Sequence, residues 1–181
     1  MRPAAGFTLI EVLVTTAIMA LLLGLAAPSF TPLLERWRVQ QTVGDMASSM
    51  QLARSEAIKR GGSILIQANT GTDWGTGWHV FLDVNTDRAQ AACAPLEIPN
   101  ECDLQVTSAP TLLDVSLTGS TGGITVDRWG MMSHTGSGSN APTAMSFEFK
   151  PKGKTLADNS AFKLCMNASG RLARKKGSDT C

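Results

Sequence analysis

Residues 6–28 read GFTLIEVLVTTAIMALLLGLAAP, and this stretch decides how the chain is organised. No residue from Val12 to Leu34 is charged, and a run of that length is enough to span a bilayer. Arg2 precedes the run, so the positive-inside rule places the N-terminus in the cytoplasm. The sequence therefore predicts a single-pass precursor whose remaining residues lie outside the cytoplasm.

Glu11 lies near the start of this apolar segment. An acid inside a membrane segment is costly and usually marks a function, although a side chain that reaches the membrane edge is a simpler alternative. A cleaved secretory signal and a plain anchor are alternatives for the segment as a whole. The run ends in Leu25-Ala26-Ala27-Pro28, which lacks the A-x-A form of a signal-peptidase site.

The hexapeptide Gly6-Phe7-Thr8-Leu9-Ile10-Glu11 resembles the class III leader junction of type IV pilins and of the pseudopilins of type II secretion. The resemblance implies that a prepilin peptidase cuts after Gly6 and that the new N-terminal residue, Phe7, is then N-methylated. Glu11 becomes the fifth residue of the mature chain. Because a carboxylate in lipid is poorly solvated, it is expected to pair with the Phe7 amine of a neighbouring subunit during assembly.

An amphipathic pattern follows the apolar segment and predicts that the helix continues. Apolar residues recur at spacings of three and four, namely Val39, Val43, Met46, Met50, Ala53 and Ala57. Arg60-Gly61-Gly62 supplies a basic last turn and a glycine stop. We therefore expect one helix from Phe7 to about Arg60, kinked or loosened at Gly24 and Pro28.

Beyond Gly61 the pattern becomes that of β-strands separated by polar loops, among them residues 136–142. The expected strands are residues 63–67, 77–83, 112–118, 124–127, 144–150 and 161–167. The predicted fold is α+β and pilin-like, with one long N-terminal helix packed on antiparallel sheet and a C-terminal disulfide loop. The expected division is a leader at 1–6, a transmembrane and filament-core helix at 7–34, and a globular domain at 35–181.

A second resemblance lies in the run from Trp74 to Asn85, which is similar to the W-x-x-G-W-x-V-F-x-D segment of the FimT/GspH group of minor pilins and pseudopilins. The helix end 53–60, the pair Gly170-Arg171 and the final Cys181 also resemble that group. We interpret the tryptophan-rich run as core and turn, because alternate residues of a strand share one face.

Four cysteines form two local pairs, and neighbour pairing predicts the disulfides Cys93–Cys102 and Cys165–Cys181. Four cysteines allow three connectivities, so the other two stay open. Disulfides need an oxidising compartment such as the periplasm or the cell surface. No C-x-x-C motif is present, which disfavours zinc.

No catalytic motif is found, so we predict that the protein is not an enzyme and has no cofactor. His79 is interpreted as structural, and His134 is expected in a flexible loop. Asp83, Asn85 and Asp87 have a spacing that hints at calcium ligands, but they lack the glycine and the distal glutamate of a calcium loop. We therefore predict no metal and interpret them as a polar hairpin.

The C-terminal segment is the one candidate ligand site. From residue 150 onward the chain has eight Lys/Arg against two Asp, although the whole chain carries a formal charge of only +1. Arg171, Arg174, Lys175 and Lys176 could neutralise the phosphates of double-stranded DNA without reading sequence. DNA-binding FimT-type pilins carry a C-terminal G-R-x-R element, and here the second arginine comes one residue late.

A strand conformation would direct Arg171 and Arg174 to opposite sides, whereas a coil would let them converge. A solvated loop, anionic lipid and a neighbouring pilin are the alternatives to DNA.

The resemblance to the FimT/GspH group implies a minor pilin, a structural subunit that primes assembly of a type IV pilus or sits at its tip. DNA uptake in natural transformation is a possible second role, and a type II secretion pseudopilin of the GspH type is the alternative. The implied partners are other minor pilins, the major pilin, the prepilin peptidase and the inner-membrane assembly platform. The implied location is the bacterial inner membrane, with the C-terminal domain in the periplasm, and later the pilus at the cell surface.

Overall fold

The computed structural model describes residues 6–26, 30–91, 93, 101–118, 122–134 and 141–181. The chain divides into two compact units, Met1–Glu35 and Arg36–Cys181, and each is considered by itself. Of the expected leader, only Gly6 falls within the described residues. In the expected loop at 136–142, only the last two residues do.

The first unit contains helix α1 (Leu9–Ala26) and the first turn of α2 (Thr31–Arg60). The prediction of one helix from Phe7 to Arg60 is therefore replaced by two helices, which begin at Leu9 and Thr31. Residues 27–29 between them, including the expected kink at Pro28, lie outside the described residues. In the part of the chain that the structure describes, neither helix reaches the combination of length and hydropathy that crossing a membrane requires.

In the second unit, α2 presents the predicted apolar stripe to the domain. Its members are at most 1% exposed, namely Val39, Val43, Met46, Met50, Ala53 and Ala57. The helix ends as expected at two glycines, because the N–H groups of Gly61 and Gly62 both donate to the carbonyl of Ala57, at 2.9 and 2.8 Å. Both glycines have positive φ, the conformation that favours glycine after a helix.

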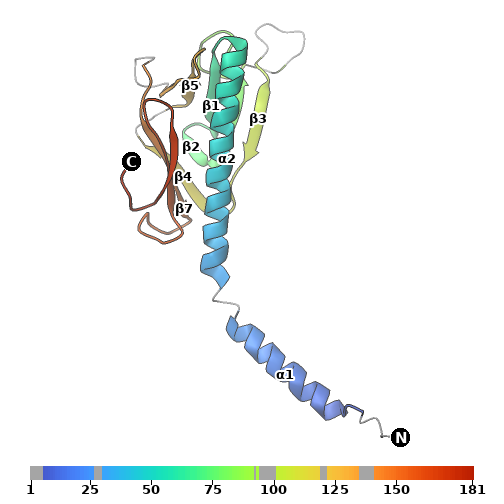
Figure 1. Ribbon diagram of the computed structural model, residues 1–181. Helices are drawn as coiled ribbons and strands as arrows, with labels where there is room; N and C mark the ends of the chain where they lie inside the picture. The colour runs from blue at the N-terminus through green and yellow to red at the C-terminus, as the bar shows by residue number, and fades with distance from the viewer. Residues whose placement is uncertain (1–5, 27–29, 92, 94–100, 119–121, 135–140) are drawn as a thin grey trace, which may run out of the picture. The chain divides into compact units, whose positions relative to one another are not determined.

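Two antiparallel sheets follow (Figure 1). The first has the order β3-β2-β1-β5-β6, with β1 Ile64–Thr70, β2 Asp73–Leu82, β3 Asp103–Ser108, β5 Ile124–Val126 and β6 Met132–His134. The second has the order β4-β7-β8-β9, with β4 Leu113–Thr118, β7 Met145–Pro151, β8 Phe162–Met166 and β9 Leu172–Lys176. The α+β prediction, one helix packed on antiparallel sheet, is confirmed.

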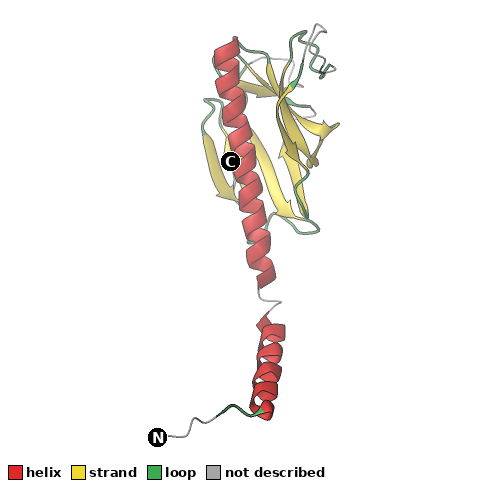
Figure 2. Ribbon diagram, turned by 90° about the vertical axis from the view of Figure 1, so that its right-hand side faces the viewer, coloured by secondary structure: helices red, strands yellow, loops and turns green. Residues whose placement is uncertain are grey.

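The core lies between α2 and the inner faces of both sheets, as the side view shows (Figure 2). One buried cluster contains side chains from the helix stripe, from β1 and β2, and from β4, β7 and β8. Trp74 of β2 meets Phe147 of β7 edge to face, with ring centroids 4.9 Å apart. This contact joins the two sheets, so the domain has one continuous core.

The six expected strands are present with small shifts at their ends, but three further strands were missed. β3 is an edge strand whose residues are half-exposed or exposed, β6 has three residues, and β9 reads LARKK. Only two apolar residues, Leu104 and Val106, alternate with polar ones in β3, and β6 and β9 have no apolar alternation. One expectation is therefore wrong, because His134 is 7% exposed in β6 rather than in a flexible loop. The segment that Cys165 and Cys181 close contains a strand, which is one of the two conformations that the sequence left open.

Candidate functional site

Gly6 and Phe7 lie just before α1, and Thr8 and Glu11 together form the start of that helix. Glu11 Oε2 accepts hydrogen bonds from the backbone N–H and the hydroxyl of Thr8, at 2.9 and 2.8 Å. The backbone N–H of Glu11 donates to the Thr8 hydroxyl at 3.3 Å. This reciprocal pattern is a capping box. The T-x-x-E spacing in the sequence could have revealed it, and it gives Glu11 a partner within its own chain.

The surface of α1 is apolar on every side. Phe7 is 89% exposed, and the other large apolar side chains of the segment are at least about half exposed, namely Leu9, Ile10, Val12, Leu13, Val14, Ile18, Met19, Leu21, Leu22 and Leu23. A helix that is hydrophobic all round is stable when lipid or other helices cover it.

The tryptophan-rich motif is structural, as the core interpretation predicts. Trp78 is fully buried, and its indole Nε1 donates a 2.9 Å hydrogen bond to the Ser49 hydroxyl on α2. Gly77 has a φ of 88° within β2, and a Cβ there would collide with the backbone of Thr107 and Ser108 in β3. The glycine between the tryptophans therefore allows two strands to approach closely.

Two of the other three elements of the second resemblance, the helix end at 53–60 and the pair Gly170-Arg171, are in contact. Arg54 on α2 donates from Nε to the carbonyl of Gly130 and from Nη2 to the carbonyl of Gly170, both at 2.9 Å. Gly130 follows β5 and Gly170 precedes β9, so one guanidinium links the helix to both sheets. The sequence indicated the helix end and the pair Gly170-Arg171 separately. It did not indicate that Arg54 of the helix end bonds to the carbonyl of Gly170.

The structure contains both expected disulfides. Cys93 and Cys102 have Cα atoms 4.6 Å apart and close a short segment before β3. Cys165 of β8 and the C-terminal residue Cys181 have Cα atoms 5.5 Å apart. The second bond ties the chain end back to β8 and therefore encloses β9 within a covalent loop.

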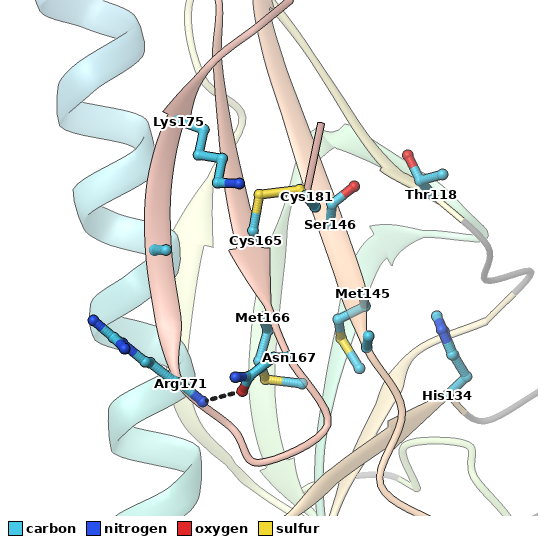
Figure 3. A pocket seen from close by; sticks show the side chains of 12 residues that line it. Thr118, His134, Met145, Ser146, Cys165, Met166, Asn167, Arg171, Lys175 and Cys181 are labelled. Atoms are coloured by element: carbon cyan, nitrogen blue, oxygen red, sulfur yellow. Dashed lines mark hydrogen bonds between the residues drawn. A yellow bond between two sulfur atoms is a disulfide. The ribbon is translucent and has the colours of Figure 1, made fainter. Parts of the chain in front are cut away.

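The four cationic residues proposed for DNA binding lie on or next to β9, the edge strand of its sheet. Arg171 and Lys175 line a pocket of about 560 Å³ beside the Cys165–Cys181 bond (Figure 3). Arg174 pairs in register with Leu164 of the core and extends to Gly44 on α2, so it lies on the opposite face of the strand. A strand therefore separates Arg171 from Arg174, and the four cations do not gather on one face.

The pocket in Figure 3 offers two cations, two hydroxyls and an imidazole. Arg171, Lys175, Ser146, Thr118 and His134 are among the residues that line it. None of its described lining residues is Asp or Glu. Arg171 and Lys175 make the pocket suitable for an anion.

His79 has the surroundings of a structural histidine. It stacks on Phe81 with ring centroids 5.2 Å apart, and Nδ1 lies 3.1 Å from Asn69 Oδ1. Burial lowers the pKa of His79 below its ordinary value, and the negative charge of Asp103 opposes this shift. The neutral imidazole is therefore favoured in the folded chain.

Asp83 and Asp87 of the expected polar hairpin are joined by Glu101, which the sequence analysis did not consider. One carboxylate oxygen of each residue lies within 4.8 Å of the others. Asn85 bonds to Asp87 rather than joining this cluster, with its Nδ2 donating to Asp87 Oδ2 at 2.8 Å. The sequence analysis expected no distal glutamate, and Glu101 supplies a third carboxylate from within the segment that the Cys93–Cys102 bond closes.

Comparisons with known proteins agree with this architecture. Residues 42–176 match the family model described as type II transport protein GspH, and residues 1–27 match the prokaryotic N-terminal methylation motif. The pilin-like protein PilA1 of Thermus thermophilus is 35% identical over 83 residues. That match covers 46% of this chain and about half, 51%, of the relative's length.

Two solved structures share the fold. The type IV minor pilin FimU of Pseudomonas aeruginosa PAO1 aligns with a TM-score of 0.57 and 23% identity, covering 80% of this chain and 93% of that one. The minor pseudopilin EpsH of the Vibrio cholerae type II secretion system aligns with a TM-score of 0.51 and 10% identity, covering 79% and 99%.

Proposed function

The chain belongs to the GspH family of minor pilins and pseudopilins, and on that premise we propose that it is a structural, non-enzymatic subunit of a type IV pilus. Its membership confirms the resemblance to the FimT/GspH group. In this proposal the C-terminal domain packs on the outside of the filament and α1 supplies the contacts between subunits. Assembly priming and a place at the tip are the two roles that the proposal allows.

The observation that carries this proposal is the surface of α1. Its apolar side chains are exposed on all faces, and the methylation motif at residues 1–27 covers the same segment. Burying such side chains removes apolar surface from water, which contributes about 25 cal/mol for each Å². Lipid can cover the helix before assembly, and the helices of other subunits can cover it afterwards.

The processed N-terminus supplies the second part of the proposal. Cleavage after Gly6 would release the amine of Phe7, next to a helix start at which Glu11 accepts two bonds from Thr8. Both bonds go to Oε2, so the other carboxylate oxygen, Oε1, can accept the amine of a neighbouring subunit while Glu11 keeps its cap. We infer that this pairing sets the axial register between subunits.

The inner membrane is the proposed location before assembly. The charge-free run from Val12 to Leu34 and Arg2 on its N-terminal side support a single-pass orientation with the domain in the periplasm. The prepilin peptidase, the assembly platform, the major pilin and other minor pilins are the proposed partners.

Mass spectrometry of pili sheared from the native host tests the proposal. We expect this chain beside an abundant major pilin, beginning with N-methylated Phe7. Gly6→Val should leave the chain unprocessed. Glu11→Gln should be processed but absent from pili, because the amide lacks the negative charge.

Thr8→Val is the matched control, because it removes the two hydrogen bonds of the Thr8 hydroxyl but keeps the carboxylate of Glu11. If Thr8→Val and Glu11→Gln reduce incorporation equally, then capping rather than pairing explains the role of Glu11.

A type II secretion pseudopilin is the second candidate, and the description of the matching family model favours it. The two disulfides and the cationic edge strand favour a surface-exposed pilus subunit instead. A processed chain found only in the cell envelope, with secretion lost and pili intact after gene deletion, would decide for the pseudopilin.

Contact with double-stranded DNA is a subsidiary proposal that rests on the edge position of β9. Strand β9 lies at an edge of its sheet, so among the described residues no further strand covers its outer side. Side chains from both faces of β9 are accessible from that side, so Arg174 and Lys175 could both reach a duplex. Lysine-rich edges also protect sheets from pairing with other chains, which is the alternative explanation.

The full chain in non-ionic detergent should shift duplex DNA, and its affinity should fall steeply with salt. Paired replacement of Arg174 and Lys176 by Ala should weaken binding, and Lys59→Ala on α2 is the control. Equal binding by all three proteins would exclude a contact at this edge.

A further inference from the structure

Three carboxylates meet where β2 ends and β3 begins. Asp83 follows β2, Asp87 lies four residues later, and Glu101 comes two residues before β3. One oxygen of each lies within 4.8 Å of the others. Asp83 and Glu101 are 2% and 0% exposed, whereas Asp87 is open to solvent. Two buried negative charges at this separation repel one another strongly unless a cation lies between them or one carboxyl keeps its proton.

Glu101 organises the loop that follows β2. Its Oε1 accepts the backbone N–H groups of Val84 and Asn85 at 2.8 and 3.2 Å, and its Oε2 accepts that of Ala91 at 2.7 Å. These donors are neutral, so they orient the carboxylate without cancelling its charge. Each oxygen of a carboxylate offers two lone-pair sites, which leaves Glu101 able to bind a further partner.

Asp83 is the side chain that is left unsatisfied. Its Oδ2 accepts the backbone N–H of Arg88 at 3.2 Å, but in the described part of the chain no donor reaches the buried Oδ1. A buried oxygen without a donor destabilises the fold, and more so when it is charged. Burial raises the pKa of Asp83, and the charges of Glu101 and Asp87 raise it further against the backbone donors.

Access and ligand chemistry both suit a hard cation. Asp87 is open to solvent, which gives a hydrated ion a route to the cluster, whereas the pocket of about 480 Å³ that Asp83 lines is also lined by Arg88 and Arg128. All three groups are oxygen donors, and oxygen ligands are those that Ca²⁺ and Mg²⁺ prefer. Ca²⁺ accepts six to eight ligands in irregular geometry, whereas Mg²⁺ demands a near-ideal octahedron. A loop held by backbone bonds and the Cys93–Cys102 disulfide fits the more tolerant ion.

We propose that Asp83, Asp87 and Glu101 bind one Ca²⁺ ion, which fastens the loop after β2 to the start of β3. Asp83 Oδ1 supplies the ligand that lacks a protein partner, Glu101 supplies a carboxylate already oriented by the loop, and Asp87 closes the site from the solvent side. Water fills the remaining positions. The site is independent of the filament proposal, because it involves only the C-terminal domain.

Calorimetric titration of the full chain in non-ionic detergent, first freed of metal with a chelator, tests the proposal. We expect one Ca²⁺ per chain with a dissociation constant of about 0.1–1 mM, the range of extracellular calcium modules. Mg²⁺ should bind more weakly. Asp87→Asn should weaken Ca²⁺ binding roughly tenfold, because ligand charge sets affinity. Asp45→Asn, which changes an exposed acid on α2, is the matched control and should bind as the wild type does.

Asp83→Asn separates a metal site from a purely structural cluster. Because it removes one of two buried like charges, it should preserve or raise the unfolding temperature in chelator and abolish the increase that Ca²⁺ causes in the wild type. Absence of saturable Ca²⁺ binding at about 1 mM, or wild-type binding by both Asp83→Asn and Asp87→Asn, would overturn the proposal. Glu101 is left unchanged, since its three backbone bonds make it necessary for the loop.

Discussion

Nη2 of Arg54 donates a 2.9 Å hydrogen bond to the carbonyl oxygen of Gly170, 116 residues away in the sequence. Gly170 has a φ of 78°, and a Cβ at this position would collide with the guanidinium. Residue 170 must therefore be glycine for the Arg54 guanidinium to reach its carbonyl oxygen. Since Nε of Arg54 also bonds to Gly130, this side chain couples α2 to both sheets.

Arg54→Ala should lower the free energy of unfolding by about 2–4 kcal/mol, because two carbonyls lose a charged donor. Arg54→Lys should restore only part of this loss, since an ammonium cannot reproduce the forked geometry of a guanidinium. Urea denaturation of the full chain in detergent, followed by tryptophan fluorescence, measures both. Arg128→Ala, at an exposed arginine, is the control and should stay within about 0.5 kcal/mol of the wild type.

Gly77→Ala should destabilise the domain more than Gly71→Ala does. Both glycines have positive φ, which costs an alanine about 1–2 kcal/mol. A Cβ at Gly71 meets nothing within 4 Å, whereas a Cβ at Gly77 meets the backbone of β3. The difference between the two variants in urea denaturation therefore measures the close approach of β2 and β3. Equal losses of unfolding free energy in the two variants would mean that the positive φ alone accounts for the cost of Gly77→Ala.

Ser49→Ala should cost about 1–3 kcal/mol, because the buried indole N–H of Trp78 loses its acceptor. Once Trp78 is replaced by Phe, the same serine change should cost less. A double-mutant cycle should therefore give a coupling energy of about 1 kcal/mol. Ser55→Ala, on the exposed side of the same helix, is the control and should have little effect. A coupling energy near zero would mean that this hydrogen bond contributes nothing net.

Stability should decrease in mild acid because of His79. Burial lowers its pKa in the folded chain, so the unfolded chain binds more protons near the ordinary value of about 6.5. The stability that neutral His79 contributes is fully present above pH about 6.5 and is lost as the pH falls toward the lowered pKa of the folded chain. His79→Gln should make the dependence of unfolding free energy on pH shallower, whereas Asp103→Asn should steepen it by removing the opposing charge. A His79→Gln profile parallel to that of the wild type would contradict this account.

Local pattern was enough to predict most elements. The apolar run after Gly6 and the stripe from Val39 to Ala57 can be recognised from residue type and period, because burial of one helix face requires that spacing. The six strands with alternating apolar residues were found for the same reason. The leader junction and the tryptophan-rich motif indicated the family before any fold was available.

Strand β9 is an element that local sequence pattern does not predict. Its sequence, LARKK, lacks an apolar alternation, and it becomes a strand because it pairs with β8 and because the Cys165–Cys181 bond encloses it. This pairing is what separates Arg171 from Arg174. The position of a cation on one face or the other depends on strand register, which a charge count does not contain.

The sequence by itself determined the apolar N-terminal segment, the amphipathic helix, most strands and the family, because each of these depends on neighbouring residues or short motifs. Only the tertiary structure decided that Arg54 meets Gly170, that His134 is buried, and that Glu101 joins Asp83 and Asp87. Those arrangements bring together groups far apart in the chain. Their positions follow from sheet pairing and core packing, which no local spacing specifies.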